Sequence, residues 1–375
     1  MKFIVEPTEL VDAVNWVARS LSSRPIKAEL LGIMIDVDTS ITLTGSDLET
    51  STKAILKAEI SAKGKVLVPG RLLAEIARSL PNKPITFTLD GSRVLVTAGT
   101  AKFTLPTLSV NEYPTLPELP ETAGVIPSDV FAHAVNQVAI AAGKDDSLPT
   151  LTGVHIEIHQ NKIILAATDR YRLAVRELNW QAKDNEIEVN TLVRARTLAD
   201  AAKSLTAHSQ VTLALSPTTS NERLIGFLSE LKTMTSRTLD GTFPPFKHLL
   251  PSESVAEATI EVAPFLDSVR RVALVTDKTV PLRLIFADNS LQLEAGAGEE
   301  AQATEELEII YSGEPINIAF NPQYLTDGLQ AIGTPFVQIN FTGASKPAVL
   351  TGKHELSGTR DISYQYLLMP MRYSA

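Results

Sequence analysis

The sequence predicts an α+β protein of three repeated domains, each with two helices packed on antiparallel sheets. Three different markers recur along the chain at nearly one spacing, which chance seldom produces. The markers are a first helix that opens at or beside a proline (Pro7, Pro127 and Pro264), a second helix that follows a strand-like run (from Gly70, Arg194 and Pro322), and an aromatic residue with proline that ends a module (Tyr113-Pro114 and Phe243-Pro244). The length of 375 residues suits three cores better than one. We predict domains over residues 1–120, 121–252 and 253–375.

The first helix of each module is amphipathic. In the first copy, five apolar residues follow the spacing of one helical face: Leu10, Val14, Val17, Ala18 and Leu21. A proline suits the first turn because its φ is fixed and its missing N–H is not needed there. We expect six helices, over residues 7–21, 70–80, 127–141, 194–205, 264–275 and 322–332.

Between the helices, apolar and polar residues alternate with a period of two, which predicts antiparallel strands joined by short turns. The expected strands are 3–6, 33–37, 41–44, 50–60, 66–68, 85–89, 94–97 and 102–105 in the first module; 124–126, 154–158, 163–167, 171–178 and three between 211 and 237 in the second; and 259–263, 282–286, 291–295, 304–311, 337–341 and 362–368 in the third. A strand-like run is also expected directly before each second helix. The prolines between Pro114 and Pro127 predict a linker that lies over the surface.

Composition limits the class of protein. The chain has no cysteine, which excludes disulfides and cysteine-based zinc sites. It shows neither an apolar stretch long enough to span a membrane nor a secretory leader, so we expect a cytoplasmic protein.

The charge is unevenly distributed. A net charge of −9 argues against nucleic acid as a partner, but the expected helices are net +1 and the rest of the chain carries −10. One interpretation is a basic helical surface on an acidic protein. The other is that solvated helix faces simply tolerate arginine.

Catalytic and cofactor signals are weak. No phosphate-binding glycine loop is present, so we expect no cofactor. Asp47 and Asp169 lie in matching turns; a carboxylate pair could serve hydrolysis, but aspartate also caps turns, and the repetition favours that structural role. His155, Glu157 and His159 would share one strand face, as a metal site or an ordinary solvated face would. We expect neither catalytic residues nor a resident metal.

Over its full length the chain resembles the bacterial DNA sliding clamp, the beta subunit of DNA polymerase III. The motifs that carry the resemblance are Ser23-Arg24-Pro25, the run Ala-Thr-Asp-Arg-Tyr-Arg-Leu-Ala-Val at 167–175, Leu-Asp-Gly-Thr-Phe-Pro at 239–244, Tyr311-Ser312-Gly313 and Met-Pro-Met-Arg at 369–372. The family implies the DNA clamp fold and a head-to-tail homodimer whose six domains close a ring around duplex DNA, with the helices lining the hole.

The resemblance also implies a function and partners. The protein would be a processivity factor in DNA replication rather than an enzyme, and would bind duplex DNA without sequence preference. Its protein partners would be DNA polymerase III and other polymerases, the clamp loader, and repair proteins with linear clamp-binding motifs, with no membrane partner.

Site residues follow from the resemblance. Arg24 and Arg196 match DNA-facing positions, and charge and helix placement add Arg71, Arg194 and Lys203. The implied partner-peptide pocket between domains two and three comprises Leu151, Thr168, Tyr171, Arg172, Leu173, Pro244, Leu249, Leu367, Met369, Pro370, Met371 and Arg372. Arg170 and His248 belong to the same pocket but depart from the residues usual in the family, which leaves peptide preference open there.

The implied dimer contact joins Phe103 and Leu105 of one subunit to Leu274 of the other. Two other classes stay open on the sequence alone. One is a monomeric three-domain binding module without DNA; the other is a metal-dependent hydrolase that uses Asp47 or Asp169.

Overall fold

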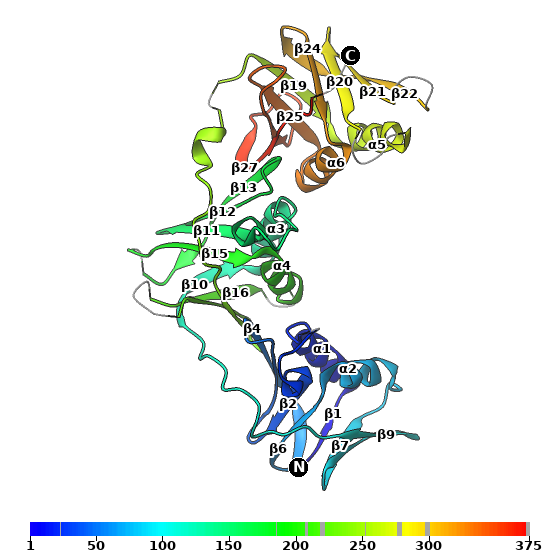
Figure 1. Cartoon of the computed structure of the whole chain (residues 1–375), viewed down its shortest axis with the longest axis vertical. Coiled ribbons are helices and arrows are strands. Elements are labelled where there is room, and N and C mark those ends of the chain that lie inside the picture. Colours follow the sequence, from blue (N-terminus) through cyan, green and yellow to red (C-terminus); the bar gives the residue numbers. More distant parts are fainter. Residues whose placement is uncertain are drawn as a thin grey trace. The chain divides into compact units, whose positions relative to one another are not determined.

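The computed structural model of the chain (Figure 1) describes residues 1–22, 24–184, 186–206, 209–217, 222–251, 253–275, 280–296 and 301–372. All six predicted helices are confirmed: α1 Pro7–Ala18, α2 Gly70–Ser79, α3 Ser128–Ala139, α4 Ala195–Ser204, α5 Val262–Val272 and α6 Pro322–Ala331. Ser23, part of one motif named above, lies outside the described residues. Within the described part of the chain, no helix is long and apolar enough to cross a membrane.

One order of elements recurs three times. The first module runs β1 Lys2–Val5, α1, β2 Gly32–Val37, β3 Ile41–Ser46, β4 Thr50–Leu56, β5 Ala58–Ala62, β6 Gly64–Pro69, α2, β7 Ile85–Asp90, β8 Arg93–Ala98 and β9 Ala101–Pro106. The second runs β10 Glu121–Pro127, α3, β11 Gly153–His159, β12 Lys162–Thr168, β13 Arg172–Asn179, β14 Gln181–Ala182, β15 Glu188–Arg194, α4, β16 Gln210–Leu215, β17 Leu224–Leu228 and β18 Lys232–Arg237. The third runs β19 Ala256–Glu261, α5, β20 Leu282–Ala287, β21 Ser290–Ala295, β22 Ala303–Glu308, β23 Ile310–Gly313, β24 Ile316–Phe320, α6, β25 Phe336–Phe341, β26 Ala348–Lys353 and β27 Asp361–Leu368.

The sequence prediction missed some strand details. The runs predicted over 50–60 and 304–311 each divide into two strands, at Lys57 and Ile309. Strands β14 and β26 were not predicted. Every residue of β26 is buried, so its sequence lacks the alternation that marks a strand with one solvated face.

The described residues form two compact units. The first comprises Met1–Ala132, Trp180–Ile187 and Thr197–Thr238; it holds a five-stranded sheet, β5-β1-β7-β8-β9, and a nine-stranded sheet, β14-β10-β16-β17-β18-β4-β3-β2-β6. In Figure 1, α1 and α2 lie side by side over these strands. Leu10, Val14 and Val17 of the apolar stripe of α1 are buried. Trp16 is buried as well, and its indole donates a hydrogen bond to the Lys53 carbonyl at 3.1 Å.

The second unit comprises His133–Asn179, Glu188–Arg196 and Leu239–Ala375. It holds a nine-stranded sheet, β15-β11-β12-β13-β27-β26-β25-β19-β23, and a four-stranded sheet, β22-β21-β20-β24, with α5 packed on α6. Gly328 in α6 permits a close approach to β27, because a Cβ there would lie 2.4 Å from the Tyr366 ring.

Two strand pairings join consecutive modules, and we call them seams. Seam one pairs Thr50–Ala54 of β4 with Lys232–Ser236 of β18, inside the first unit. Seam two pairs Arg172–Arg176 of β13 with Tyr364–Leu368 of β27, inside the second unit. Each seam sets the fourth strand of one module against the last strand of the next.

Candidate functional site

A tight turn at the start of seam two positions the first polar groups of the site. Thr168 Oγ1 accepts a hydrogen bond from the Arg170 N–H (3.1 Å) and donates to the Arg172 carbonyl (2.7 Å). The Asp169 carboxylate accepts from the N–H groups of Tyr171 (3.0 Å) and Arg172 (3.1 Å). Arg170 adopts a left-handed backbone conformation with φ of 80°.

The same turn occurs in the first module. The Asp47 carboxylate accepts from the N–H groups of Glu49 (3.0 Å) and Thr50 (2.7 Å), and Ser46 Oγ accepts from the Leu48 N–H (3.0 Å). Leu48 has φ of 79°. The two aspartates therefore cap backbone groups in duplicated turns, which confirms their structural interpretation.

The Arg172 side chain leaves its turn and is buried among acidic and aromatic groups. Its Nε donates to Asp169 (2.9 Å), and its Nη1 donates to Asp327 (2.6 Å) and to the Tyr366 hydroxyl (3.3 Å). The guanidinium carbon lies 4.3 Å from the centre of the Tyr324 ring, a cation–π geometry. Burial alone would lower the pKa of Arg172, but these partners outweigh burial and raise it. The cation thus ties the turn to α6 and β27.

A cavity of about 490 Å³ opens beside this cation. Four of the predicted pocket residues line it: Leu151, Arg170, Tyr171 and Arg172. The Tyr171 side chain is 57% exposed, and its ring stacks on Tyr324 with centroids 6.5 Å apart. Asp145 also lines the cavity, and hydrogen bonds from Ser147 lower the pKa of its carboxyl group. The cavity therefore offers aromatic surface flanked by charges of both signs.

A cluster of buried apolar side chains packs on the sheet at seam two. It consists of Ala166, Leu173, Val175, Leu192, Phe243, Phe246, Val349 and Leu367. Two of the predicted pocket residues, Leu173 and Leu367, belong to this cluster. Three others, Pro244, His248 and Leu249, are exposed on the chain that crosses it, and Leu249 is 44% exposed.

The backbone that follows β27 runs beside the turn. The Met369 N–H donates to the Tyr171 carbonyl (2.9 Å), and the Met371 N–H donates to the Ala319 carbonyl (2.8 Å). Met369 is exposed, Pro370 and Met371 are half-buried, and Arg372 is exposed. All of the predicted pocket residues therefore lie in the second unit.

Sequence reasoning missed the contribution of α6. Gln323, Tyr324 and Asp327 line the cavity, and the Gln323 amide donates to Asp327 at 2.7 Å. A signal was available, because the second helices of the three modules align and only this copy carries a large aromatic residue where the others have Leu72 and Thr197.

The five predicted DNA-facing residues are all exposed: Arg24, Arg71, Arg194, Arg196 and Lys203. The Arg71 guanidinium donates to the Ser22 carbonyl at 3.3 Å, which holds it beside the loop that carries Arg24. Within the described ranges, none of the five forms an ion pair with a carboxylate. Two other arginines differ, since Arg19 pairs with Asp200 at 3.1 Å and Arg271 pairs with Glu305. Five cations therefore remain available to an external anion.

The three predicted dimer residues differ in exposure. Leu274 is 83% exposed and Phe103 is half-buried, but Leu105 is fully buried. Leu105 pairs with Val94 and its side chain packs inside its own module, so only the backbone of Leu105 is left for a contact with a second subunit.

The histidines on β11 have separate roles. The His155 ring is buried and stacks on Phe243 with centroids 5.0 Å apart. His159 is exposed near Glu188, at 3.3 Å, and Glu157 pairs with Lys247 at 2.7 Å. Among the residues that the structure describes, no three acidic or histidine side chains gather as metal ligands would.

Family models match the chain in consecutive segments. They are the DNA polymerase III beta subunit N-terminal domain over residues 1–117, its central domain over 125–245 and its C-terminal domain over 247–372. The chain is 48% identical over 375 residues to the beta sliding clamp of Streptomyces coelicolor, with 100% of both chains covered. It is 40% identical over 374 residues to a beta sliding clamp homolog, GriR, of Streptomyces muensis, again with 100% of both covered.

Solved structures show the same fold. The sliding clamp of Bacillus subtilis superposes with a TM-score of 0.90 at 25% identity, with 100% of both chains covered. A Pseudomonas aeruginosa clamp bound to griselimycin superposes with a TM-score of 0.91 at 26% identity, also with 100% of both covered.

Proposed function

Because the chain belongs to the DNA polymerase III beta subunit family, we propose that it is a DNA polymerase processivity factor. It forms a sliding clamp, a ring that encircles duplex DNA and tethers polymerases to it in the cytoplasm, and it catalyses no reaction itself. The observation that carries this proposal is the repetition of the seams, because it predicts how a second copy closes the ring.

Ring closure follows from one pairing rule. In both seams, the fourth strand of a module pairs with the last strand of the next. Strand β22 is the fourth strand of the last module and β9 is the last strand of the first, and in the described part of the chain neither has such a partner. Two copies that pair β22 with β9 head to tail would form a closed ring of six domains, three per copy over residues 1–120, 121–252 and 253–375.

The side chains at these edges suit that contact. Strand β9 exposes Lys102, whereas β22 exposes Glu306 and Glu308. Opposite charges on two open edges favour the pairing and its register. The exposed Leu274 and the half-buried Phe103 would then be covered.

Replacing both Phe103 and Leu274 by aspartate tests the contact. We expect soluble monomers, because each carboxylate would have to be desolvated in the dimer. Analytical ultracentrifugation at moderate salt measures the mass. A dimer that persists in the double variant would contradict this interface.

The DNA surface is proposed to be the helical face that carries Arg24, Arg71, Arg194, Arg196 and Lys203. These cations would attract phosphates without reading bases, while the acidic remainder of the chain repels DNA elsewhere. Binding should therefore be weak, salt-sensitive and independent of sequence.

Retention on circular DNA tests encirclement. A ring loaded on nicked circular DNA should stay bound through a gel-filtration column and should dissociate once the circle is cut. Equal retention on linear and circular DNA would indicate ordinary phosphate binding instead.

Partner proteins are proposed to dock at seam two. Tyr171, Leu249 and Met369 are large apolar side chains that are each more than two-fifths exposed, and they lie around a buried apolar cluster in one unit. Such surface suits short linear motifs with one or two large apolar residues, such as those of polymerases, the clamp loader and repair proteins. The griselimycin-bound relative is consistent with a ligand pocket in this fold.

Deleting residues 369–375 tests the pocket. We expect a glutamine- and leucine-rich clamp-binding peptide to lose most of its affinity, as measured by fluorescence anisotropy. The truncated chain must still dimerise, and unchanged affinity in that dimer would overturn the assignment.

A further inference from the structure

A hollow of about 750 Å³ lies at seam one, under the first linker, residues 107–120. Its backbone matches that of seam two. The Leu108 N–H donates to the Leu67 carbonyl (2.8 Å) where the first linker leaves β9, and the Leu239 N–H donates to the Leu192 carbonyl (2.7 Å) where the second linker, residues 239–251, leaves β18. Each linker then carries an aromatic residue followed by proline over the sheet. The two sites are therefore equivalent by the repeat.

Strand register identifies the matching side chains. Thr44 pairs with Met34 and Lys53, whereas in the next module Ala166 pairs with His155 and Val175. Across the seams, Ser51 pairs with Thr235, whereas Leu173 pairs with Leu367. Lys53 thus stands where Val175 does, and Ser51 and Thr235 stand where two leucines do. At these matched positions, the apolar side chains of seam two are replaced by hydroxyl groups and an ammonium group at seam one.

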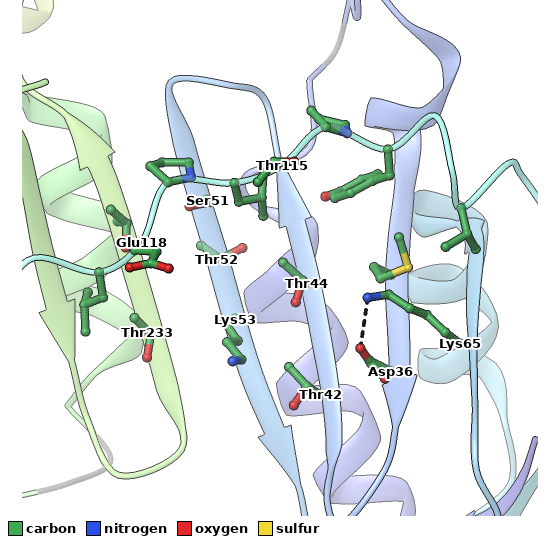
Figure 2. Close-up of a pocket in the computed structure, with 18 residues that line it drawn as sticks. Asp36, Thr42, Thr44, Ser51, Thr52, Lys53, Lys65, Thr115, Glu118 and Thr233 are labelled. Atoms are coloured by element: carbon green, nitrogen blue, oxygen red, sulfur yellow. Dashed lines mark ion pairs between the residues drawn. The ribbon is translucent and has the colours of Figure 1, made fainter.

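Figure 2 shows Thr42, Thr44 and Lys53 on two neighbouring strands, with Glu118 on the linker that crosses them. Lys65 pairs with Asp36 at 3.0 Å at one side of the hollow. Lys53, by contrast, has no carboxylate within ion-pair distance among the described residues, and its side chain is exposed.

The Tyr113 hydroxyl adds an unused polar group. Tyr113 lines the hollow, its hydroxyl oxygen is buried, and it has no hydrogen-bond partner among the described residues. Burial raises the pKa of Tyr113 to about 12, so the phenol keeps its proton. A buried hydroxyl without a partner is costly, and a ligand acceptor reached by a small shift of the linker would satisfy it.

We propose that the seam-one hollow binds an extended polar peptide segment, with a carboxylate side chain opposite Lys53 and hydroxyl or amide side chains against the threonines. A volume of this size accommodates several residues rather than a single ion. Glu118 would accept peptide N–H or amide donors from the other wall. The inference rests on the proposed function, because it treats seam two as a peptide pocket and seam one as its polar duplicate.

Methyl NMR on the full-length dimer tests the proposal, with the threonine methyl groups labelled. The probe is the capped peptide Gln-Ser-Asp-Ser-Asp-Ser, and its counterpart with asparagine for aspartate is the matched control. We expect the resonances of Thr42, Thr44, Thr233 and Thr235 to shift in a saturable manner, and the affinity to fall about fivefold in Lys53→Gln, as for loss of one partly exposed ion pair. Lys57→Gln, an exposed lysine that does not line the hollow, should leave the affinity unchanged.

Other results would overturn the proposal. These are no methyl shifts up to about 10 mM peptide, equal binding of the asparagine peptide, or equal shifts with inorganic phosphate, which would indicate a simple anion site. Met369→Asp separates the two seams: it should abolish binding of the glutamine- and leucine-rich peptide and leave the polar peptide bound. If it abolishes both, the polar peptide binds at seam two and the seam-one site is wrong, whereas the proposed function stands.

Discussion

Seam one and seam two share a backbone and differ in the side chains of one face. Each pairs five residues of a module's fourth strand with the last strand of the next module, and each starts from an aspartate turn whose next residue has φ of 79° or 80°. Strand pairing uses only backbone groups, so the side chains of the face under the linker can change without loss of the pairing. A duplicated fold can therefore keep its frame and alter the ligand chemistry at one seam.

Each seam has a buried cation, on β13 at seam two and on β18 at seam one, and the two cations differ in the burial of their partners. At seam two, Arg172 is enclosed by Asp169 and Asp327, whose side chains are also mostly buried. At seam one, Lys232 is equally buried, but its partner Asp12 is 67% exposed, at 2.7 Å. Removal of Arg172 would leave two mostly buried carboxylates without a counter-ion. Removal of Lys232 would leave only Asp12, which water can solvate.

Arg172→Met should therefore give the largest effect. Removing the guanidinium leaves two carboxylates without their cation, and we expect a loss of about 3–5 kcal/mol in unfolding free energy. Lys232→Met, which has the same type of change at seam one, should cost about 1 kcal/mol or less because Asp12 stays hydrated. Urea unfolding monitored by circular dichroism measures both. Equal losses would show that the two seams are energetically alike.

Exchanging one matched residue should give the next largest effect. Leu367→Thr places the seam-one side chain in the apolar cluster, and we expect a loss of about 2–3 kcal/mol from the lost burial and the buried hydroxyl. The same variant should weaken the clamp-binding peptide about tenfold or more. Thr235→Val at seam one is the control, expected to change stability by less than about 1 kcal/mol. If Leu367→Thr leaves peptide affinity intact, the cluster is not part of the pocket.

Sequence patterns predicted the six helices and most of the strands. The prolines and apolar stripes predicted all six helices, and alternation predicted most strands, because both depend on local periodicity. Alternation failed for β26, which is buried on both faces. It also could not show that β4 and β13 each pair with a strand of the next module, since those partners are roughly 180 to 200 residues away along the chain.

The candidate site was predicted only in part. The resemblance supplied Leu173, Arg172 and Met369, but the contact of Arg172 with Asp327 depends on how α6 packs beside β27. The burial of Leu105 was likewise invisible, because an edge strand gives the same alternation whichever face packs inward. Both the Arg172–Asp327 contact and the burial of Leu105 depend on packing between residues far apart in the sequence.

A pH difference between the seams should follow from His155, which stands where seam one has Met34. Burial lowers the pKa of His155, while Glu157 partly opposes this and Lys247 adds to it. The unfolded chain then binds a proton more readily, so stability is full above the unfolded pKa of about 6.5 and is lost as pH falls below it toward the folded pKa. We expect His155→Met to reduce the loss of stability between about pH 7.5 and pH 5 by up to about 1 kcal/mol. Burial also lowers the pKa of His133. His133 is present in the wild type and in the variant, so its contribution cancels when their pH profiles are compared. An unchanged pH profile would remove His155 from the explanation.

The smallest effects on stability are expected at Leu48 and Arg170, the two turn residues with left-handed backbone conformations. Variants of these residues distinguish backbone strain from a role in peptide binding. Both occupy a conformation that costs a side-chain-bearing residue about 1 kcal/mol, so glycine should relieve similar strain in each, offset in part by the greater entropy of the unfolded chain. We expect Leu48→Gly and Arg170→Gly each to stabilise the protein by less than about 1 kcal/mol. Only Arg170 lines the seam-two cavity, so only Arg170→Gly should change the affinity for clamp-binding peptides, with a stronger effect on peptides that carry an acidic residue beside the motif. Unfolding curves and anisotropy titrations on the same samples measure the two quantities. If both variants gain stability and neither changes peptide binding, Arg170 is a tolerated strain with no part in recognition.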